Sequence, residues 1–448
     1  MGRIFGTDGV RGIANERLDV ELALAISRAA GTIIKQDGNN RPRILVGRDT
    51  RLSGEMLESA VAAGLASVGC DVELLGVVPT PAVAYLVKEL AADGGVMITA
   101  SHNPYMYNGI KYFGSTGFKL TDEQEERIEA MVLDGREPMA LAFGGEIGRV
   151  AENRCAVEKY IDHIASAVGS LEGLRIAVDC ANGAASAVAE RVFAKTGAAA
   201  AFINREPNGV NVNENCGSLH IEALGKFVKE NGFDLGVAFD GDADRCLCVN
   251  ENGEVVDGDF IMAICARDML RRGKLARKTV VGTIMANMGF SKFCEENGIN
   301  FIPTKVGDRY VLEEMEMEGY CFGGEQSGHV IFRDFATTGD GQLTAVQLLA
   351  HLKQENLTLA EAAKVMKRYP QTMINVNVSH DGKLAFYMDA EVKRAIEEGK
   401  ARLAENGRVV ARVSGTEPLI RIMVEGLDET LIQEVAEQIA GVVRARLA

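Results

Sequence analysis

Four polar loops in this sequence carry residue types that transfer or bind a phosphoryl group. The first, the serine loop, runs from Thr99 to Pro104 (TASHNP) and follows an apolar, strand-like run. Ser101 is its candidate nucleophile, because a serine hydroxyl transfers a group once it is activated or already phosphorylated. His102 and Asn103 stand next to it and could orient it. The alternative is a helix N-cap serine followed by a turn proline.

The second loop, the acidic loop, runs from Asp240 to Arg245 (DGDADR) and alternates three carboxylates. This spacing lets Asp240, Asp242 and Asp244 turn toward one point. Crowded carboxylates repel one another, and a hard divalent cation such as Mg²⁺ relieves that repulsion. Three side-chain oxygens leave the ion's shell incomplete, and a phosphate is the natural further ligand. The alternative is a solvated acidic turn.

The third loop, the sugar loop, runs from Gly324 to His329 (GEQSGH). Glu325 and Ser327 are two residues apart, so in an extended segment both side chains face the same way. A carboxylate and a hydroxyl side by side suit a vicinal diol. The alternative is a glycine-rich turn with an incidental polar pair. His329 is a candidate general acid or base, or else an ordinary loop histidine.

The fourth loop, the anion loop, runs from Arg412 to Arg421 (RVSGTEPLIR) and combines charge, hydroxyls and backbone amides. Such a combination is typical of an anion cradle. Its candidate anion-binding residues are Arg412, Ser414, Gly415, Thr416 and Arg421. The alternative is a hairpin connection with two surface arginines.

Three cations elsewhere could balance a phosphorylated serine. They are Arg11 in GTDGVRG, Lys111 in NGIKY and Arg245 at the end of the acidic loop. Lys111 is also a second candidate for the general acid or base.

Three stretches must position the first three loops, and they share one plan. Residues 43–100, 174–240 and 278–329 each read as strands alternating with helices, and each final strand runs into one of these loops. Such alternation predicts βαβ units in mostly parallel sheets. Ligands bind at the carboxyl ends of the strands in such sheets.

The chain after Pro370 changes character, with alternating strands and helices expected near Asp389–Asn406 and Asp428–Leu447. We therefore predict an α/β protein: three tandem, similar α/β domains with mixed, mostly parallel sheets, and a smaller C-terminal α+β domain. The expected domains cover residues 1–150, 151–254, 255–369 and 370–448.

Composition excludes several classes of protein. The 448 residues are 47% hydrophobic and carry a formal charge of −15, which argues against a disordered chain and against nucleic acid or an anionic membrane as the main partner. No apolar run is long enough to span a membrane, and the N-terminus does not resemble a secretory signal. The scattered cysteines lack a CxxC pair, so we expect reduced thiols and a cytoplasmic location.

Taken together and in this order, the four loops resemble the α-D-phosphohexomutase family, from GTDGVRG to the SGTEP segment. Gln326 and the segment VGDRYV (306–311) are similar to its amino-sugar branch rather than its phosphomannomutase/phosphoglucomutase branch. The resemblance implies four domains around a central cleft and Ser101 as a phosphoserine. One Mg²⁺ per chain would be held by the three aspartates and a phosphate oxygen on Ser101. The sugar loop would bind sugar hydroxyls, and the anion loop would bind the non-reacting phosphate.

The implied reaction interconverts glucosamine 6-phosphate and glucosamine 1-phosphate through a 1,6-bisphosphate, supplying amino-sugar nucleotide and cell-wall precursor synthesis. The implied partners are a hexosamine phosphate and that bisphosphate, and the family also suggests a homodimer. Three alternatives stay open. They are a phosphoglucomutase or phosphomannomutase, a Mg²⁺-dependent sugar phosphatase, and a non-catalytic sensor, although a sensor should lack the serine or the three aspartates.

Overall fold

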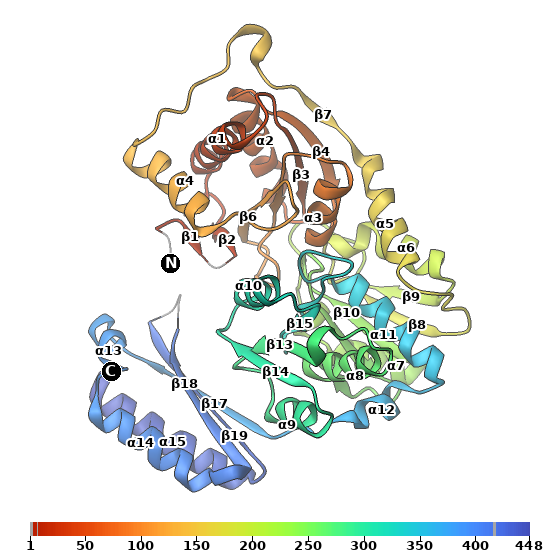
Figure 1. Cartoon of the computed structure of the whole chain (residues 1–448), viewed down its shortest axis with the longest axis vertical. Helices are drawn as coiled ribbons and strands as arrows, with labels where there is room; N and C mark the ends of the chain where they lie inside the picture. The colour runs from red at the N-terminus through yellow and green to blue at the C-terminus, as the bar shows by residue number, and fades with distance from the viewer. Residues whose placement is uncertain (1–2, 7, 415–417) are drawn as a thin grey trace. The chain divides into compact units, whose positions relative to one another are not determined.

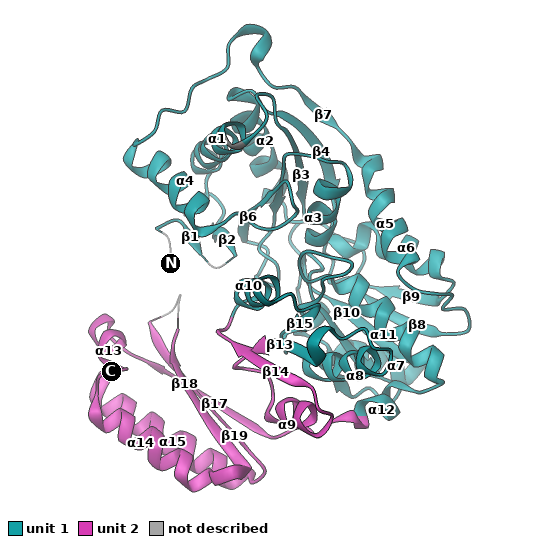
Figure 2. Cartoon of the chain, viewed as in Figure 1, with its two compact units in different colours: residues 1–281, 307–363 teal, residues 282–306, 364–448 magenta. Residues whose placement is uncertain are grey.

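The computed structural model describes residues 3–6, 8–414 and 418–448. Four sheets alternate with helices along the chain (Figure 1). The chain divides into two compact units (Figure 2). Unit 1 comprises residues 1–281 and 307–363, and unit 2 comprises residues 282–306 and 364–448.

The first sheet has seven strands in the order β1-β2-β6-β5-β3-β4-β7. Its strands are β1 Phe5–Gly6, β2 Gly9–Ile13, β3 Arg43–Arg48, β4 Asp71–Val77, β5 Gly94–Ile98, β6 Tyr107–Gly114 and β7 Val150–Glu152. Its helices are α1 Val20–Asp37, α2 Ser53–Ser67, α3 Thr80–Glu89 and α4 Asp122–Asp134. Every residue of β5 is buried, as expected of a central strand covered on both faces. Thr121 and Gln124 start α4 with a capping box.

The second sheet has the order β12-β11-β10-β8-β9. Its strands are β8 Arg175–Asp179, β9 Ala199–Ile203, β10 Leu235–Phe239, β11 Cys246–Asn250 and β12 Val255–Val256. Its helices are α5 Val157–Ser166, α6 Ala189–Thr196 and α7 Glu222–Asn231. The apolar strand β10 is buried throughout, so the acidic loop that follows it starts from a rigid position.

The third sheet has the order β14-β13-β15-β16. Its strands are β13 Thr279–Thr283, β14 Asn300–Thr304, β15 Phe322–Gly324 and β16 Val330–Phe332. The helices of this part of the chain are α8 Gly258–Arg271, α9 Met288–Glu296, α10 Asp308–Glu318, α11 Gly341–Glu355 and α12 Leu359–Ala362.

The fourth sheet is antiparallel, with the order β17-β19-β18, and lies in unit 2. Its strands are β17 Gln371–Asn377, β18 Gly407–Val413 and β19 Leu419–Gly426, and its helices are α13 His380–Ala385, α14 Ala390–Leu403 and α15 Glu429–Leu447. Apolar residues of α14, α15 and the strands form one buried core. This is the smaller α+β domain that the sequence predicts.

The α/β class and the mixed sheets are confirmed. Parallel pairs do not outnumber antiparallel ones in the first two sheets, however, because β6 and β11 run back antiparallel beside the strands that lead into the serine and acidic loops. No helix among the described residues is long and apolar enough to cross a membrane.

Candidate active site

The serine loop lies between β5 and β6 and holds Ser101 in a strained conformation. Ser101 has φ = 50° and is 1% exposed. A left-handed conformation at a non-glycine residue costs about 1–3 kcal/mol and persists where the surroundings fix it. The Ser101 carbonyl accepts hydrogen bonds from Arg51 (2.7 Å) and Asn213 (2.9 Å), and its N–H donates to Thr99 (3.0 Å).

A buried ion pair from the turn after β3 holds the loop in place. Arg51 and Asp49 are paired at 2.8 Å with both side chains fully buried. Thr99 donates to Asp49 over 2.7 Å, so the ion pair is tied to the start of the loop. Arg51 also donates to four carbonyls along the loop, those of Ser101, Asn103, Pro104 and Tyr107.

The acidic loop approaches the serine loop at the carboxyl end of β10. A Cβ at Gly241 would stand 2.5 Å from the Ser101 carbonyl oxygen, so only glycine allows this approach. Ala243 has φ = 56°, which curls the loop. Ser101 Oγ donates to Asp240 Oδ2 over 2.6 Å. The candidate nucleophile and the candidate metal ligands, 139 residues apart in sequence, therefore meet at one point.

The three carboxylates fit a hard divalent cation. Asp240, Asp242 and Asp244 are buried, and one oxygen of each lies within 4.8 Å of the others. Asp242 Oδ1 and Asp244 Oδ1 are buried without a hydrogen-bond partner. Orphaned buried carboxylate oxygens are costly unless a cation satisfies them. Oxygen ligands of this kind are those that Mg²⁺ prefers.

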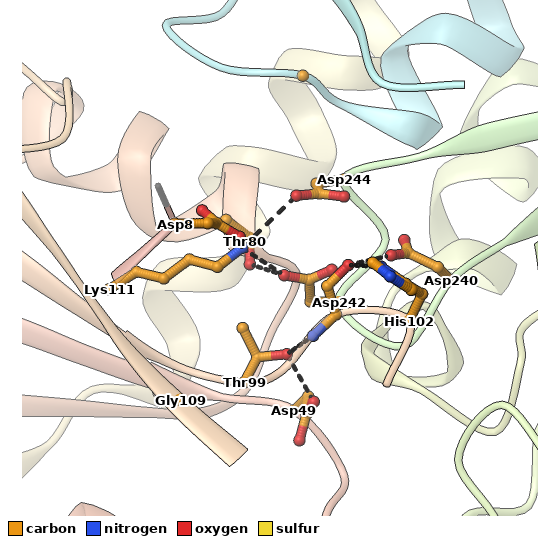
Figure 3. Close-up of polar contacts among 12 residues, drawn as sticks. Asp8, Asp49, Thr80, Thr99, His102, Gly109, Lys111, Asp240, Asp242 and Asp244 are labelled. Atoms are coloured by element: carbon orange, nitrogen blue, oxygen red, sulfur yellow. Dashed lines mark hydrogen bonds and ion pairs between the residues drawn. The ribbon is translucent and has the colours of Figure 1, made fainter. Parts of the chain in front are cut away.

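Lys111 on β6 supplies charge to the same carboxylates. Its Nζ lies 3.0 Å from Asp242, 3.0 Å from Asp8 and 3.6 Å from Asp244 (Figure 3). Burial opposes protonation of this lysine, but these carboxylates outweigh it and raise the pKa of Lys111 above its ordinary value. Lys111 is therefore a fixed cation. Thr80 at the start of α3 donates to Asp242 as well, over 2.6 Å.

The aspartates titrate differently from one another. Burial, Asp244 and Asp242 raise the pKa of Asp240 well above its ordinary value. Burial also raises the pKa of Asp244, but Lys111 and His329 lower it by more, so the pKa of this carboxyl lies below its ordinary value. Asp244 is thus the more firmly ionised of the two.

His102 lies next to Ser101 Oγ, and the Arg245 side chain lies next to Asp244. His102 Nδ1 lies 3.3 Å from Ser101 Oγ. Burial, Arg245 and Arg11 lower the pKa of His102 to about 3, so its ring is neutral. Arg245 is held as a cation, because Asp240 and Asp244 raise its pKa against burial.

His329 joins the sugar loop to the acidic loop. Its Nδ1 lies 3.6 Å from Asp244, while its Nε2 accepts the Gly339 N–H over 3.0 Å. Burial lowers the pKa of His329, but Asp244 and Asp308 raise it by more. Together these effects raise the pKa of His329 to about 9. Nδ1 faces Asp244 and carries a proton in either form of the ring, whereas the bond from Gly339 forms only while Nε2 is deprotonated.

The sugar loop is a turn rather than the extended segment that the sequence analysis expects. The Gly328 N–H donates to the Glu325 carbonyl over 3.0 Å, and Gly328 has φ = 90°. The Glu325 carboxylate accepts the Gly307 N–H over 3.3 Å, and burial raises the pKa of this glutamate. Ser327 Oγ is buried without a hydrogen-bond partner. Both side chains thus keep hydrogen-bonding capacity for a ligand.

The segment after β1 contributes charges that the sequence analysis only partly identifies. Arg11 forms an ion pair with Asp8, which the sequence analysis missed. Asp8 also contacts Lys111 and Lys119, and Lys119 in turn contacts Asp308. An arginine close to a carboxylate in the GTDGVRG motif was the only available signal.

The anion loop belongs to unit 2 and pairs two like charges. Arg412 on β18 lies directly opposite Arg421 on β19. Burial and the neighbouring Arg421 lower the pKa of Arg412. Like charges directly opposite each other destabilise a sheet unless an anion neutralises them. Ser414 is buried at the end of β18, and Gly415 and Thr416 lie outside the described residues.

Comparison with known proteins covers nearly the whole chain. Four domain families of phosphoglucomutase/phosphomannomutase match it: alpha/beta/alpha domain I at residues 2–139, domain II at 158–253, domain III at 257–369 and the C-terminal domain at 373–442. Among its relatives, the phosphoglucosamine mutases of Alkaliphilus oremlandii and Brevibacillus brevis are each 50% identical, over 100% of both chains.

Solved structures show the same fold. A phosphoglucomutase/phosphomannomutase family protein of Burkholderia thailandensis superposes with a TM-score of 0.84 at 25% identity, covering 99% of this chain and 97% of that one. An Aspergillus fumigatus N-acetylphosphoglucosamine mutase, solved with GlcNAc-6P and magnesium, superposes with a TM-score of 0.67 at 18% identity, covering 98% and 95%.

Proposed function

The chain belongs to the phosphoglucomutase/phosphomannomutase family of α-D-phosphohexomutases, and from that premise we propose that it is a phosphoglucosamine mutase. It would interconvert glucosamine 6-phosphate and glucosamine 1-phosphate. The 2.6 Å hydrogen bond from Ser101 to Asp240 carries the proposal, because it joins a phosphate carrier to a cation site. The full-length likeness to phosphoglucosamine mutases supports the substrate.

We propose that Ser101 carries the phosphoryl group between the two positions of the sugar. A substrate hydroxyl attacks the phosphorus, the bond from phosphorus to Ser101 Oγ breaks, and a 1,6-bisphosphate forms. The bisphosphate then reorients and returns its other phosphoryl group to Ser101. Mg²⁺ held by Asp240, Asp242 and Asp244, one ion per chain, would supply charge neutralisation when bound.

The proposed roles of the other residues follow from their charges. Lys111 and Arg245 stabilise negative charge on the transferred group as fixed cations. His102 orients the serine oxygen, and Arg11 supports the site through Asp8. His329, with its proton on Nδ1, is the better candidate for moving a proton, since Lys111 is held protonated by carboxylates.

We propose that the sugar and anion loops bind the two ends of the substrate. Sugar hydroxyls would form hydrogen bonds with Glu325, Ser327 and His329. The non-reacting phosphate would be bound by Arg412, Ser414, Gly415, Thr416 and Arg421. An anion between Arg412 and Arg421 relieves their repulsion.

The wider setting is also proposed. We retain the division into domains at residues 1–150, 151–254, 255–369 and 370–448, and the homodimer. The nine cysteines form no disulfide among the described residues, which supports a reducing, cytoplasmic location.

The test follows ³¹P signals while the protein turns over glucosamine 6-phosphate with Mg²⁺ and a trace of its 1,6-bisphosphate. We expect glucosamine 1-phosphate to form without inorganic phosphate. Stoichiometric release of inorganic phosphate would instead identify a sugar phosphatase. A kcat/KM for glucose or mannose 1-phosphate equal to that for glucosamine 1-phosphate would favour a phosphoglucomutase or phosphomannomutase.

A further inference from the structure

A second carboxylate lies beside the sugar loop. Asp308, the first residue of α10, places Oδ2 3.7 Å from His329 Nε2. The preceding residue, Gly307, donates its N–H to the Glu325 carboxylate over 3.3 Å. Asp308 adds to the effect of burial in raising the pKa of Glu325, because the two negative charges are close. Two acidic side chains from different segments thus face the same part of the site.

These acidic groups outnumber their cationic partners. Asp308 pairs with Lys119 Nζ at 2.6 Å, and Lys119 also contacts Asp8 at 2.5 Å, although Asp8 has Arg11 and Lys111 as further partners. Glu325 forms no ion pair with a lysine or arginine within the described part of the chain. The Asp308 side chain is 18% exposed, so it remains accessible to a ligand. Among the described residues, Glu325 and Asp308 thus have one lysine or arginine ion-pair partner between them, Lys119.

Asp308 is held ionised in spite of its burial. Burial raises its pKa, but Lys119 and His329 outweigh that effect and lower the pKa of Asp308 below its ordinary value. A neutral sugar hydroxyl would form only an ordinary hydrogen bond with this carboxylate, whereas an ammonium group would form a charge-assisted one.

We propose that Asp308 binds the ammonium group at C2 of the amino sugar, next to Glu325, and so determines the preference for glucosamine phosphates over glucose phosphates. This inference rests on the proposed function, which supplies the sugar phosphate as substrate. C2 lies beside a hydroxyl-bearing carbon of the same ring, and Glu325 is proposed to bind sugar hydroxyls. Adjacent carboxylates can therefore bind adjacent substituents of one ring.

The test compares Asp308→Asn with the wild-type protein on two substrates. The substitution keeps the size of the side chain and removes its charge. We expect kcat/KM for glucosamine 6-phosphate to fall about 10–100-fold, the effect of losing one hydrogen bond to a charged group, with a change of less than about threefold for glucose 6-phosphate. Glu313→Gln, which removes an exposed carboxylate from the same helix, is the matched control and should leave both values unchanged.

A second measurement needs no variant. Calorimetry on the wild-type, dephosphorylated protein should show glucosamine 6-phosphate binding at least about tenfold more tightly than glucose 6-phosphate. Equal affinities, or an equal loss of both activities in Asp308→Asn, would overturn the inference while leaving the mutase proposal intact. Failure of the wild-type protein to turn over glucosamine 6-phosphate would instead contradict the proposed function and this inference with it.

Discussion

The buried pair of Asp49 and Arg51 is expected to control both the stability of unit 1 and the position of Ser101. In Arg51→Met the side chain keeps its approximate length but loses its charge and its donors. Three carbonyls of the serine loop and that of Tyr107 at the start of β6 then lose their partner, and Asp49 is left buried without a counterion.

The magnitude follows from complete burial of both side chains. Removing one partner of such a pair costs about 3–5 kcal/mol of unfolding free energy. A shift of the loop by about 1 Å lowers kcat roughly 100-fold, since the reacting oxygen leaves its aligned position. Arg41→Met breaks the exposed pair with Asp71 and is the matched control, with an expected cost below about 1 kcal/mol.

The loss should also depend on pH. Burial already raises the pKa of Asp49, and Arg51 offsets that only in part. Without Arg51 the pKa of Asp49 in the folded state rises further above its value in the unfolded state. The folded protein then loses stability as the pH rises from the unfolded-state pKa to the folded-state pKa. Arg51→Met should therefore cost more stability near pH 8 than near about pH 5.

Urea titration followed by circular dichroism measures the stability, and steady-state turnover of glucosamine 6-phosphate measures the activity. The double variant Asp49→Asn/Arg51→Met should regain part of the stability, because no charge stays buried, but not the activity. Wild-type kcat in the folded Arg51→Met protein would refute the role of the pair in positioning Ser101.

Two further predictions concern the cation and the anion. Asp242→Asn is expected to raise the Mg²⁺ concentration for half-maximal activity at least about tenfold, because one ligand loses its charge; an unchanged Mg²⁺ titration would contradict the metal site. Arg421→Gln removes half of the arginine pair and should raise KM about 10–100-fold with a smaller change in kcat, measured by steady-state kinetics. Arg394→Gln on the exposed face of α14 should change neither constant, and equal effects of the two substitutions would count against the anion loop.

The serine, acidic and sugar loops were predictable from sequence because each follows a buried strand. Ser101 and the acidic loop stand at the ends of β5 and β10, where an apolar run stops and polar residues begin. The topology of an α/β sheet brings such strand ends to one edge. The alternation of strands and helices was predictable because apolar, strand-like runs alternate with helical patterns along the sequence.

The partners that fix these loops were not predictable in the same way. The sequence did not single out Asp49, Arg51 or Asp8, because the contacts that give them their roles, from Arg51 to the serine loop and from Asp8 to Lys111, join distant segments. Asp308 looks like an ordinary first-turn acid of α10 until the fold places it beside the sugar loop. Local spacing carries no signal for such long-range pairs.

The sheet direction after the loops was also missed. Antiparallel strands β6 and β11 return beside β5 and β10, and Lys111 reaches Asp8 and Asp242 only because β6 runs in this direction. The sequence of β6 shows no clean alternation of apolar and polar residues, since six of its eight residues are buried. The expectation that Glu325 and Ser327 lie in an extended segment failed because Gly328 turns the chain.

The central claim is that Ser101 carries the phosphoryl group next to the acidic loop. Its most direct test is the intact mass of the purified protein, with the modified peptide mapped before and after mixing with glucosamine 6-phosphate. We predict one phosphate on Ser101, lost to the substrate on mixing with excess sugar phosphate and absent from Ser101→Ala. A protein that turns over substrate with no phosphate on Ser101, or a Ser101→Ala variant that keeps wild-type turnover, would contradict the account.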